Sequence, residues 1–288
     1  MKNIAIIGRD ANKTNVDLVR RWRALGLDAR LLSPSEARRV LRPGDVGIAR
    51  LDVLPTLDGI EEGLLELLEL AADGVRIVNN ARSLVNAHDK LRTGRCLAAA
   101  DVPHVRTLHV RARDEVSLPP PIVVKPRFGS WGIDVMRCDD VESIDAVFAT
   151  IARRRWFGRH GAIVQPLMPP MGRDLRILVA NGEMVGAEGR VAARGEWRTN
   201  ISVGGGHLAL VPGSDAIEVA VAAAAATGGE FVGVDLMPTF GGHVVLEVNA
   251  AVEFDVNYAT GGDVFAYAAA ALGLVAPPVD VPLAAELR

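Results

Sequence analysis

The lysines of this chain are the residues whose type and position first suggest chemistry. Only four of the 32 lysines and arginines are lysines, namely Lys2, Lys13, Lys90 and Lys125. A lysine carries a compact, strongly hydrated ammonium and an arginine a planar fork, so the two are not interchangeable at an anion site. The few ammonium groups therefore stand out, although chance and coding bias explain any single lysine equally well.

The segment V-V-K-P-R-F-G-S-W-G, residues 123–132, has the pattern of an anion-binding turn. An apolar strand delivers Lys125 and ends at Pro126, and the glycines at 129–132 predict a flexible turn whose N–H groups can face phosphate oxygens. The G-x-x-x-x-G-K-[ST] phosphate loop occurs nowhere in the chain, so this turn would belong to a different kind of site. The alternative is an ordinary hairpin turn with a solvated lysine.

Polar groups near the C-terminus form a candidate metal site. Glu247 and Asn249 alternate with apolar residues in L-E-V-N, so their side chains share one face of a strand. Asp235, in G-V-D-L, lies on the preceding strand of a predicted hairpin. Carboxylate and amide oxygens suit Mg²⁺. The alternative is a carboxylate that forms a salt bridge with a nearby arginine.

The register of this hairpin decides whether the three groups meet. A strict two-residue turn at Gly241-Gly242 places Asp235 opposite Val248, on the wrong face. A one-residue bulge, which the two glycines permit, brings Asp235 to the face of the other two oxygen ligands. We therefore expect a bulge in this hairpin.

Arginines form a third constellation. Asp174 and Arg176 are two residues apart on a predicted strand, Arg190 follows further along the chain, and W-R-T-N occupies 197–200. Guanidinium groups bind phosphate and carboxylate through paired hydrogen bonds. The segment suits the clamping of an anionic substrate, although in an arginine-rich chain one arginine alone means little.

The elements that position these residues alternate between strand and helix near the N-terminus. Gly8 stands alone, without the G-x-G-x-x-G of a dinucleotide site, so a Rossmann dehydrogenase is poorly supported. The alternation predicts a small parallel α/β layer over residues 1–80. Strands are expected at 3–7, 29–32, 46–49 and 76–78, and helices at 15–25 and 60–72.

The rest of the chain is predicted to combine hairpins with helices. Asn181-Gly182 is a strong hairpin signal, Asp215 with Glu218 predicts a capping box, and the prolines of 166–170 predict a linker without helical structure. We expect strands at 122–125, 133–137, 162–167, 175–180, 183–189, 231–236 and 243–248, helices at 89–101, 141–152 and 215–227, and a polar loop at 195–206.

Composition excludes several classes of protein. A net charge of −3 and a pI near 6.1 give no electrostatic case for nucleic-acid binding. Cys96 and Cys138 lie too far apart for a CxxC motif, which fits a reducing compartment. The N-terminal segment lacks the features of a signal peptide, and no apolar run approaches the roughly 20 residues of a membrane span. We therefore expect a cytoplasmic protein without a membrane or nucleic-acid partner.

Together these segments resemble the ATP-grasp superfamily, in particular the RimK-like amino-acid ligases, which include the ribosomal-protein glutamate ligase and LysX. The resemblance spans nearly the whole chain through I-A-I-I-G-R-D, N-A-H-D-K-L-R-T, V-V-K-P-R-F-G-S-W-G, I-V-Q-P-L-M, D-L-R-I-L-V, E-W-R-T-N and G-V-D-L…L-E-V-N-A. Each motif alone is weak, but their order and spacing are specific. Pro166 replaces the acidic residue usual in the adenine hinge, and Glu253-Phe254 is closer to the LysX branch.

The resemblance implies a fold of the mixed α/β (α+β) class. An N-terminal parallel α/β layer would span residues 1–87, a central subdomain with a glycine-containing lid 88–162, and a C-terminal antiparallel-sheet subdomain with the metal site 163–288. ATP would lie between the central and C-terminal subdomains. The acceptor would approach from the N-terminal side, with Arg50 and the loop 195–206 as candidates for substrate contacts.

The resemblance also implies roles for individual residues. Two lysines would contact the ATP phosphates, and the Gln165 segment would line the adenine. The residues implied in nucleotide binding are Lys90, Lys125, Gly129, Ser130, Trp131, Gly132, Gln165, Leu167, Asp174 and Arg176; those implied near the reacting groups are Arg190, Arg198 and Asn200; and those implied at the metal are Asp235, Glu247 and Asn249.

The implied activity is ATP-dependent ligation of a carboxylate to an amine through an acylphosphate. Such a reaction requires positioning and charge neutralisation by lysine, arginine and Mg²⁺, or Mn²⁺ in its place. The partners would be ATP and an amino acid, a peptide or a carrier protein, and a homo-oligomer is compatible with the resemblance. Two alternatives stay open, namely an ATP-grasp kinase and, because of Pro166, a nucleotide-binding protein that has lost catalysis.

Overall fold

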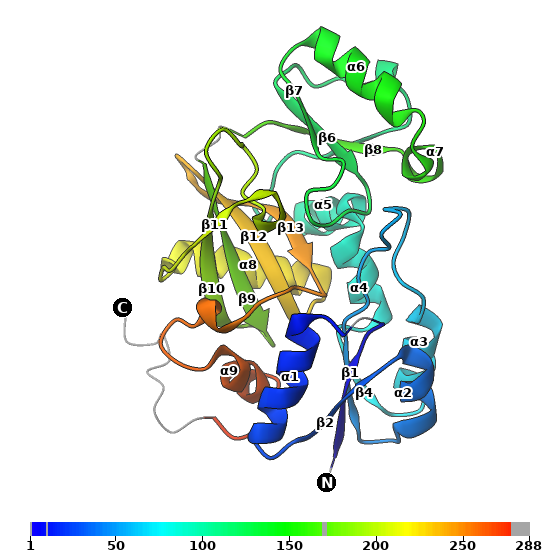
Figure 1. The fold of residues 1–288 in the computed structure, drawn as a ribbon, viewed down its shortest axis with the longest axis vertical. Helices are drawn as coiled ribbons and strands as arrows, with labels where there is room; N and C mark the ends of the chain where they lie inside the picture. Colours follow the sequence, from blue (N-terminus) through cyan, green and yellow to red (C-terminus); the bar gives the residue numbers. More distant parts are fainter. Residues whose placement is uncertain (1, 10, 169–171, 278–288) are drawn as a thin grey trace.

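The structure is a computed structural model that describes residues 2–9, 11–168 and 172–277. The chain folds into three sheets, which Figure 1 shows as separate layers joined by helices. The predicted linker at Pro169 and Pro170 lies outside the described residues. None of the helices described is long and apolar enough to cross a bilayer.

The N-terminal sheet is fully parallel, as predicted. Its strands are apolar runs, which is typical of parallel strands covered on both faces. The predicted helix at 60–72 begins only at Leu64, because Ile60 pairs with Val53 and Gly63 has a φ of +134°. The sheet order is β2-β1-β3-β4, with β1 (Asn3–Ile7), β2 (Asp28–Leu32), β3 (Val46–Ala49), β4 (Arg76–Val78), α1 (Lys13–Ala24), α2 (Pro34–Val40) and α3 (Leu64–Ala72).

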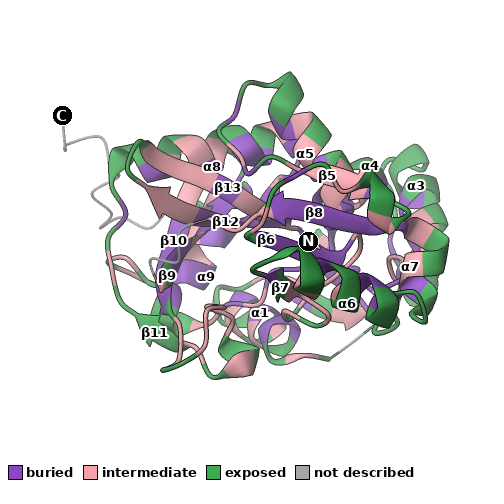
Figure 2. Cartoon of the chain, turned by 90° about the horizontal axis from the view of Figure 1, so that it is seen from above, coloured by how far each residue is buried: buried purple, intermediate pink, exposed green. Residues whose placement is uncertain are grey.

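The central sheet is antiparallel and carries two helices on one side. Figure 2 shows β6 and β8 buried and α6 with its outer turns exposed. The predicted strand 133–137 is wrong at its start, because Trp131, Gly132 and Asp134 adopt positive φ angles and the strand begins at Met136. The order is β5-β8-β6-β7, with β5 (Leu108–Val110), β6 (Ile122–Pro126), β7 (Met136–Cys138), β8 (Ala162–Pro166), α6 (Val141–Ile151) and α7 (Arg155–His160).

The C-terminal sheet is antiparallel, and α8 packs against one of its faces (Figure 1). The predicted turn at Asn181-Gly182 is confirmed, with φ angles of +48° and +82°. The order is β11-β10-β9-β12-β13, with β9 (Arg173–Ala180), β10 (Glu183–Val191), β11 (Gly206–Leu208), β12 (Phe231–Thr239), β13 (Gly242–Asn249), α8 (Ser214–Thr227) and α9 (Val264–Ala271).

The hairpin of β12 and β13 contains the predicted bulge. Asp235 lies opposite Glu247, whereas Leu236 lies opposite Val245, so Leu246 is the extra residue. The predicted turn position is wrong by one residue, because Thr239 already pairs with Gly242 and the turn residues are 240–241. The bulge therefore places Asp235 directly beside Glu247 at the site.

The predicted capping box of α8 is wrong. The helix begins at Ser214 with Gly213 as its N-cap, and no side chain caps it. The Asp215 carboxylate instead lies 2.7 Å from the Nδ1 atom of His243. This cross-link ties the first turn of α8 to β13.

The hydrophobic cores show which parts of the chain pack as a unit. Side chains of the N-terminal and C-terminal sheets share two cores, whereas the central sheet, α6 and α7 form a third core to which the N-terminal part contributes Val53 and Leu57. Helix α5 (Lys90–Ala99) follows α4 (Ala81–His88) and contributes Leu97 to a shared core. The division into three subdomains stays a prediction. Because β8 pairs with β6 in the central sheet, a boundary between the central and C-terminal subdomains would fall after Pro166 rather than after residue 162.

Candidate active site of two adjoining cavities

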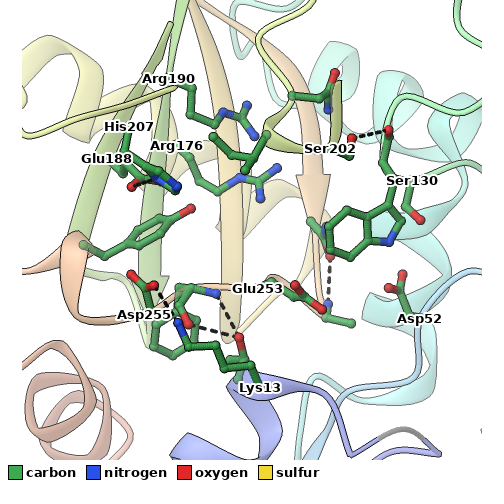
Figure 3. Close-up of a pocket in the computed structure, with 18 of the residues that line it drawn as sticks. Lys13, Asp52, Ser130, Arg176, Glu188, Arg190, Ser202, His207, Glu253 and Asp255 are labelled. Carbon is green, nitrogen blue, oxygen red and sulfur yellow. Dashed lines mark hydrogen bonds and ion pairs between the residues drawn. The ribbon is translucent and has the colours of Figure 1, made fainter. Parts of the chain in front are cut away.

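Two cavities meet between the sheets. The first, about 140 Å³, contains Lys90 and Lys125 and is called the lysine cavity; every predicted site residue except Arg176 and Asn249 lines it. The second, about 230 Å³, is bordered by Arg176, Asn249 and several carboxylates and is called the acidic cavity (Figure 3). The residues that line both cavities are Ser130, Trp131, Arg190, Asn200 and Glu247.

The two lysines of the lysine cavity come from different elements. Lys125 is the penultimate residue of β6, and Lys90 is the first residue of α5. The Nζ atom of Lys90 donates to the carbonyl oxygen of Gly129 at 2.7 Å and lies 3.2 Å from a carboxylate oxygen of Glu247. Lys90 is thus fixed between the glycine turn and β13.

A buried ion pair anchors this turn. The Arg127 guanidinium donates two hydrogen bonds to the carboxylate of Asp89, at 2.7 and 2.5 Å, and Asp89 is also the N-cap of α5. The Lys90 amide donates to the Arg127 carbonyl oxygen. Neither Asp89 nor Arg127 was assigned a role from sequence, although Asp89 directly precedes Lys90 and Arg127 lies two residues after Lys125.

The environment of Lys125 disfavours its positive charge. Burial, followed by repulsion from Lys90, lowers the pKa of Lys125 to about 8, despite the carboxylates of Glu247 and Asp235. A buried ammonium needs compensating negative charge. The lysine cavity therefore suits a polyanion.

Charged side chains form a row across one face of the C-terminal sheet. Glu188, Arg176, Asp235 and Glu247 are register neighbours on β10, β9, β12 and β13. Arg176 donates to both carboxylate oxygens of Asp235, at 2.5 and 2.7 Å. Asp235 thus forms the salt bridge with a nearby arginine that the sequence left open as the alternative to a metal ligand.

Arg190 joins two buried aspartates. It donates to both oxygens of Asp174, at 2.8 and 2.6 Å, and to Asp235 at 2.7 Å. Burial raises the pKa of Asp174, in spite of Arg190. Burial also disfavours the Asp235 anion, but Arg176 and Arg190 outweigh it and lower the pKa of Asp235.

The oxygen ligands fit a hard divalent cation. Asp235 and Glu247 are paired across the bulged hairpin, and Asn249 follows two residues later. Three hydrogen bonds to the Asp235 carboxylate leave one of its roughly four acceptor positions open. Within the described parts of the chain no group of three or more His, Cys, Asp or Glu side chains is placed to hold a metal ion, so an amide oxygen and substrate oxygens would complete the site, as Mg²⁺ accepts.

Apolar side chains also line the lysine cavity, among them Leu167 and Met237. Gln165, in the same lining, is buried, and its side-chain amide donates to the Thr107 hydroxyl at 2.8 Å. A flat, apolar group such as a nucleobase suits a lining of this kind.

The loop 195–206 closes the site from the side of the C-terminal sheet. The Ser202 hydroxyl donates to the Trp131 carbonyl oxygen at 2.7 Å, and Arg198 donates to that of Gly132 at 3.2 Å. Thr199 donates to Asp174 at 2.6 Å. The predicted loop also contains a 3₁₀ turn, Ile201–Val203, and the short strand β11 begins at its last residue, Gly206.

The suggestion that Arg50 contacts substrate is wrong. Arg50 is buried, lines neither cavity, and donates to the carbonyl oxygens of Ala251 and Val252. Sequence analysis missed Glu188, a buried residue of the acidic cavity. The available signal was its position near the end of the predicted strand 183–189, two residues before Arg190.

A family model described as the RimK-like ATP-grasp domain matches residues 87–267. A tetrahydromethanopterin:alpha-L-glutamate ligase of Methanosarcina acetivorans is 29% identical over 225 residues, 70% of this chain and 68% of the relative. A probable alpha-L-glutamate ligase of Stenotrophomonas maltophilia is 29% identical over 291 residues, 91% of this chain and 94% of the relative.

Solved structures show the same fold. A RimK domain protein ATP-grasp from Sphaerobacter thermophilus superimposes with a TM-score of 0.71 at 19% identity, over 95% of this chain and 99% of that one. The D-cycloserine synthetase DcsG gives a TM-score of 0.70 at 22% identity, over 95% and 100%. The mixed α/β ATP-grasp fold predicted from sequence is therefore confirmed.

The fold of this chain is that of the ATP-grasp enzymes. The chain belongs to the RimK-like ATP-grasp family, since that family's model covers more than half of it. At the level of this family, the prediction of an ATP-dependent ligase that forms amide bonds is confirmed.

Proposed function

We propose that this protein activates a carboxylate with ATP and joins it to an amine in the space where the two cavities meet. The observation that carries the proposal is the pair of adjoining cavities. The lysine cavity contains two lysines that suit a polyanion. The acidic cavity adjoins it, because five residues line both cavities. A ligase needs such a junction, because the activated carboxyl group formed beside the phosphates must meet a second substrate.

The proposed reaction has two steps. A carboxylate oxygen forms a bond to the γ-phosphorus of ATP while the bond to the β,γ-bridging oxygen breaks, which gives an acylphosphate and ADP. The amine nitrogen then attacks the carbonyl carbon, phosphate leaves, and the amine loses a proton. Both steps develop negative charge on oxygens, which fixed cations stabilise.

The residues of the lysine cavity divide this work. Lys90 and Lys125 would hold the phosphates, and the Gln165 segment would take the adenine, with Asp174 beside the ribose. Arg198 and Asn200 would hold the reacting carboxyl group where the glycine turn meets the loop 195–206. Arg190 would act through Asp174 and Asp235, since within the described residues its hydrogen bonds go to those two aspartates.

The metal site completes the proposal. Asp235, Glu247 and Asn249 would bind Mg²⁺, or Mn²⁺ in its place. The cation would neutralise phosphate charge. Glu247 borders both cavities and contacts Lys90, so it would couple the position of the cation to that of the phosphate-binding lysine.

A panel assay tests the proposed function. Mg-ATP is supplied with the amino acids singly and in pairs, and release of ADP and phosphate is measured together with product mass. We expect release that depends on one carboxylate–amine pair and a product heavier than either. A stable phosphorylated product without free phosphate would support a kinase, and ATP binding without turnover on amino acids, peptides and carrier proteins would support an inactive binding protein.

The pKa of Lys125 predicts how nucleotide affinity depends on pH. The bound triphosphate favours the ammonium form, whose proton is lost in the free protein as the pH rises through about 8. Affinity for a non-hydrolysable ATP analogue should therefore fall about tenfold from pH 7 to pH 9. Calorimetric titration measures this. The variant Lys125→Met should bind weakly at both pH values, and an unchanged affinity in the parent protein would contradict the assignment.

Replacement of Glu247 by glutamine tests the metal site. The change removes one anionic ligand, so the Mg²⁺ concentration at half-maximal ADP release should rise about tenfold or more. The control is Glu218→Gln on the exposed side of α8, which should leave the titration unchanged. If both variants titrate like the parent protein, the metal site lies elsewhere.

A further inference from the structure

The acidic cavity contains more negative than positive side chains. Its carboxylates outnumber its lysines and arginines by five to three. Each of the three cations already has an anionic partner, with Lys13 at 3.0 Å from Asp255 and Arg176 and Arg190 on Asp235. The carboxylates of this cavity are Asp52, Glu188, Glu247, Glu253 and Asp255.

Glu188 is the side chain that most clearly indicates a ligand. It is only 1% exposed, and its Oε1 atom forms a short hydrogen bond with Nδ1 of His207. Its Oε2 atom is buried and has no hydrogen-bond partner among the described residues. A buried carboxylate oxygen without a donor is costly, so a donor from a ligand in the cavity would remove that cost.

The position of Glu188 fixes which part of a ligand it would meet. Figure 3 shows Glu188 and His207 on one side of the acidic cavity and Ser130 on the other. Glu188 lines the acidic cavity alone, whereas Ser130 and Asn200 line both cavities, and Asn200 is proposed to hold the reacting carboxyl group, so the reacting amine belongs at the wall that the cavities share. A group that reaches Glu188 is therefore a part of the amine substrate distant from the new bond.

We infer that the amine substrate carries a second cationic group, an ammonium or a guanidinium, which binds Glu188, with Asp52 and Glu253 adding negative potential at the cavity wall. The inference rests on the proposed function and names its substrate class. An amine substrate with a second carboxylate, such as glutamate, would bring like charge toward Glu188.

Calorimetric titration of the full chain, saturated with Mg²⁺ and a non-hydrolysable ATP analogue, tests the inference. The probes are L-lysine, its uncharged analogue L-norleucine, and L-glutamate. We expect lysine to bind about tenfold or more tightly than norleucine, and glutamate to bind most weakly. Equal binding of lysine and norleucine, stronger binding of glutamate, or no binding of lysine would overturn the inference.

Matched variants separate Glu188 from a general effect of charge. Glu188→Gln should weaken lysine binding about tenfold or more and leave norleucine binding unchanged. Glu183→Gln removes the same charge from an exposed position on the same strand, and it should change neither the affinity for lysine nor the affinity for norleucine. If Glu188→Gln does not fold, Glu253→Gln provides a second test, in which a smaller loss for lysine alone is expected; equal losses for both ligands would contradict the assignment.

Failure of the two proposals can be distinguished. If the ATP analogue does not bind, the proposed function fails, and the inference fails with it. If the analogue binds and the amine preference is reversed, only the inference is overturned, and the ligase proposal stands with an acidic amine substrate.

Discussion

Replacement of Lys125 by alanine is expected to reduce ATP-dependent turnover by about 10² to 10³-fold. Lys125 is buried beside Lys90 in the lysine cavity, and fixed cations of this kind stabilise the charge that develops on transferring phosphate. The fold should persist, because the lost packing of the side chain is offset by the removal of a buried, repelled charge. Steady-state ADP release and thermal unfolding measure the two effects.

The control for this variant is Lys2→Ala, which removes an exposed lysine that lines neither cavity. It should leave turnover and unfolding unchanged. Normal turnover of Lys125→Ala would remove this lysine from the phosphate-binding site. If Lys125→Ala unfolds at a much lower temperature than the parent protein and Lys2→Ala does not, Lys125 has a structural role instead.

Replacement of Arg190 by methionine is expected to lower the free energy of unfolding by about 3–5 kcal/mol and to abolish turnover. The change leaves Asp174 buried without its guanidinium partner, with Thr199 as its remaining donor, and an uncompensated buried charge is strongly destabilising. Urea unfolding measures the loss. Arg137→Met breaks a partly exposed pair with Asp139 and should cost no more than about 1 kcal/mol.

A double variant shows whether orphaned charge causes the loss. Asp174→Asn combined with Arg190→Met removes both charges of the pair, so part of the lost stability should return. If the double variant is less stable than Arg190→Met alone, lost packing rather than the unpaired aspartate explains the effect.

Local sequence signals predicted the elements well where periodicity and turn chemistry agree. The Asn181-Gly182 turn and the N-terminal parallel strands follow from such signals. The bulge beside Asp235 was predicted because only a shifted register places it on the face of Glu247. The capping box of α8 failed because Asp215 binds His243, a partner from a distant strand.

The site was predicted as a set of residues rather than as an arrangement. Motif order singled out the lysines, the arginines and the candidate metal ligands, but long-range packing divides these residues between two cavities, with Arg176 and Asn249 in the acidic one. The ion pair of Asp89 and Arg127 and the open oxygen of Glu188 depend on contacts between segments far apart in the chain. Local patterns contain no information on such contacts.

The most direct test of the proposed reaction follows one oxygen atom. The carboxylate substrate identified by the panel assay is labelled with ¹⁸O, and the phosphate released with Mg-ATP and the amine is analysed by mass spectrometry. Attack of the carboxylate on the γ-phosphoryl group predicts one ¹⁸O atom in the phosphate, because the acylphosphate oxygen leaves with it. Unlabelled phosphate, released together with the amide product, would contradict the acylphosphate and require a different route to the bond.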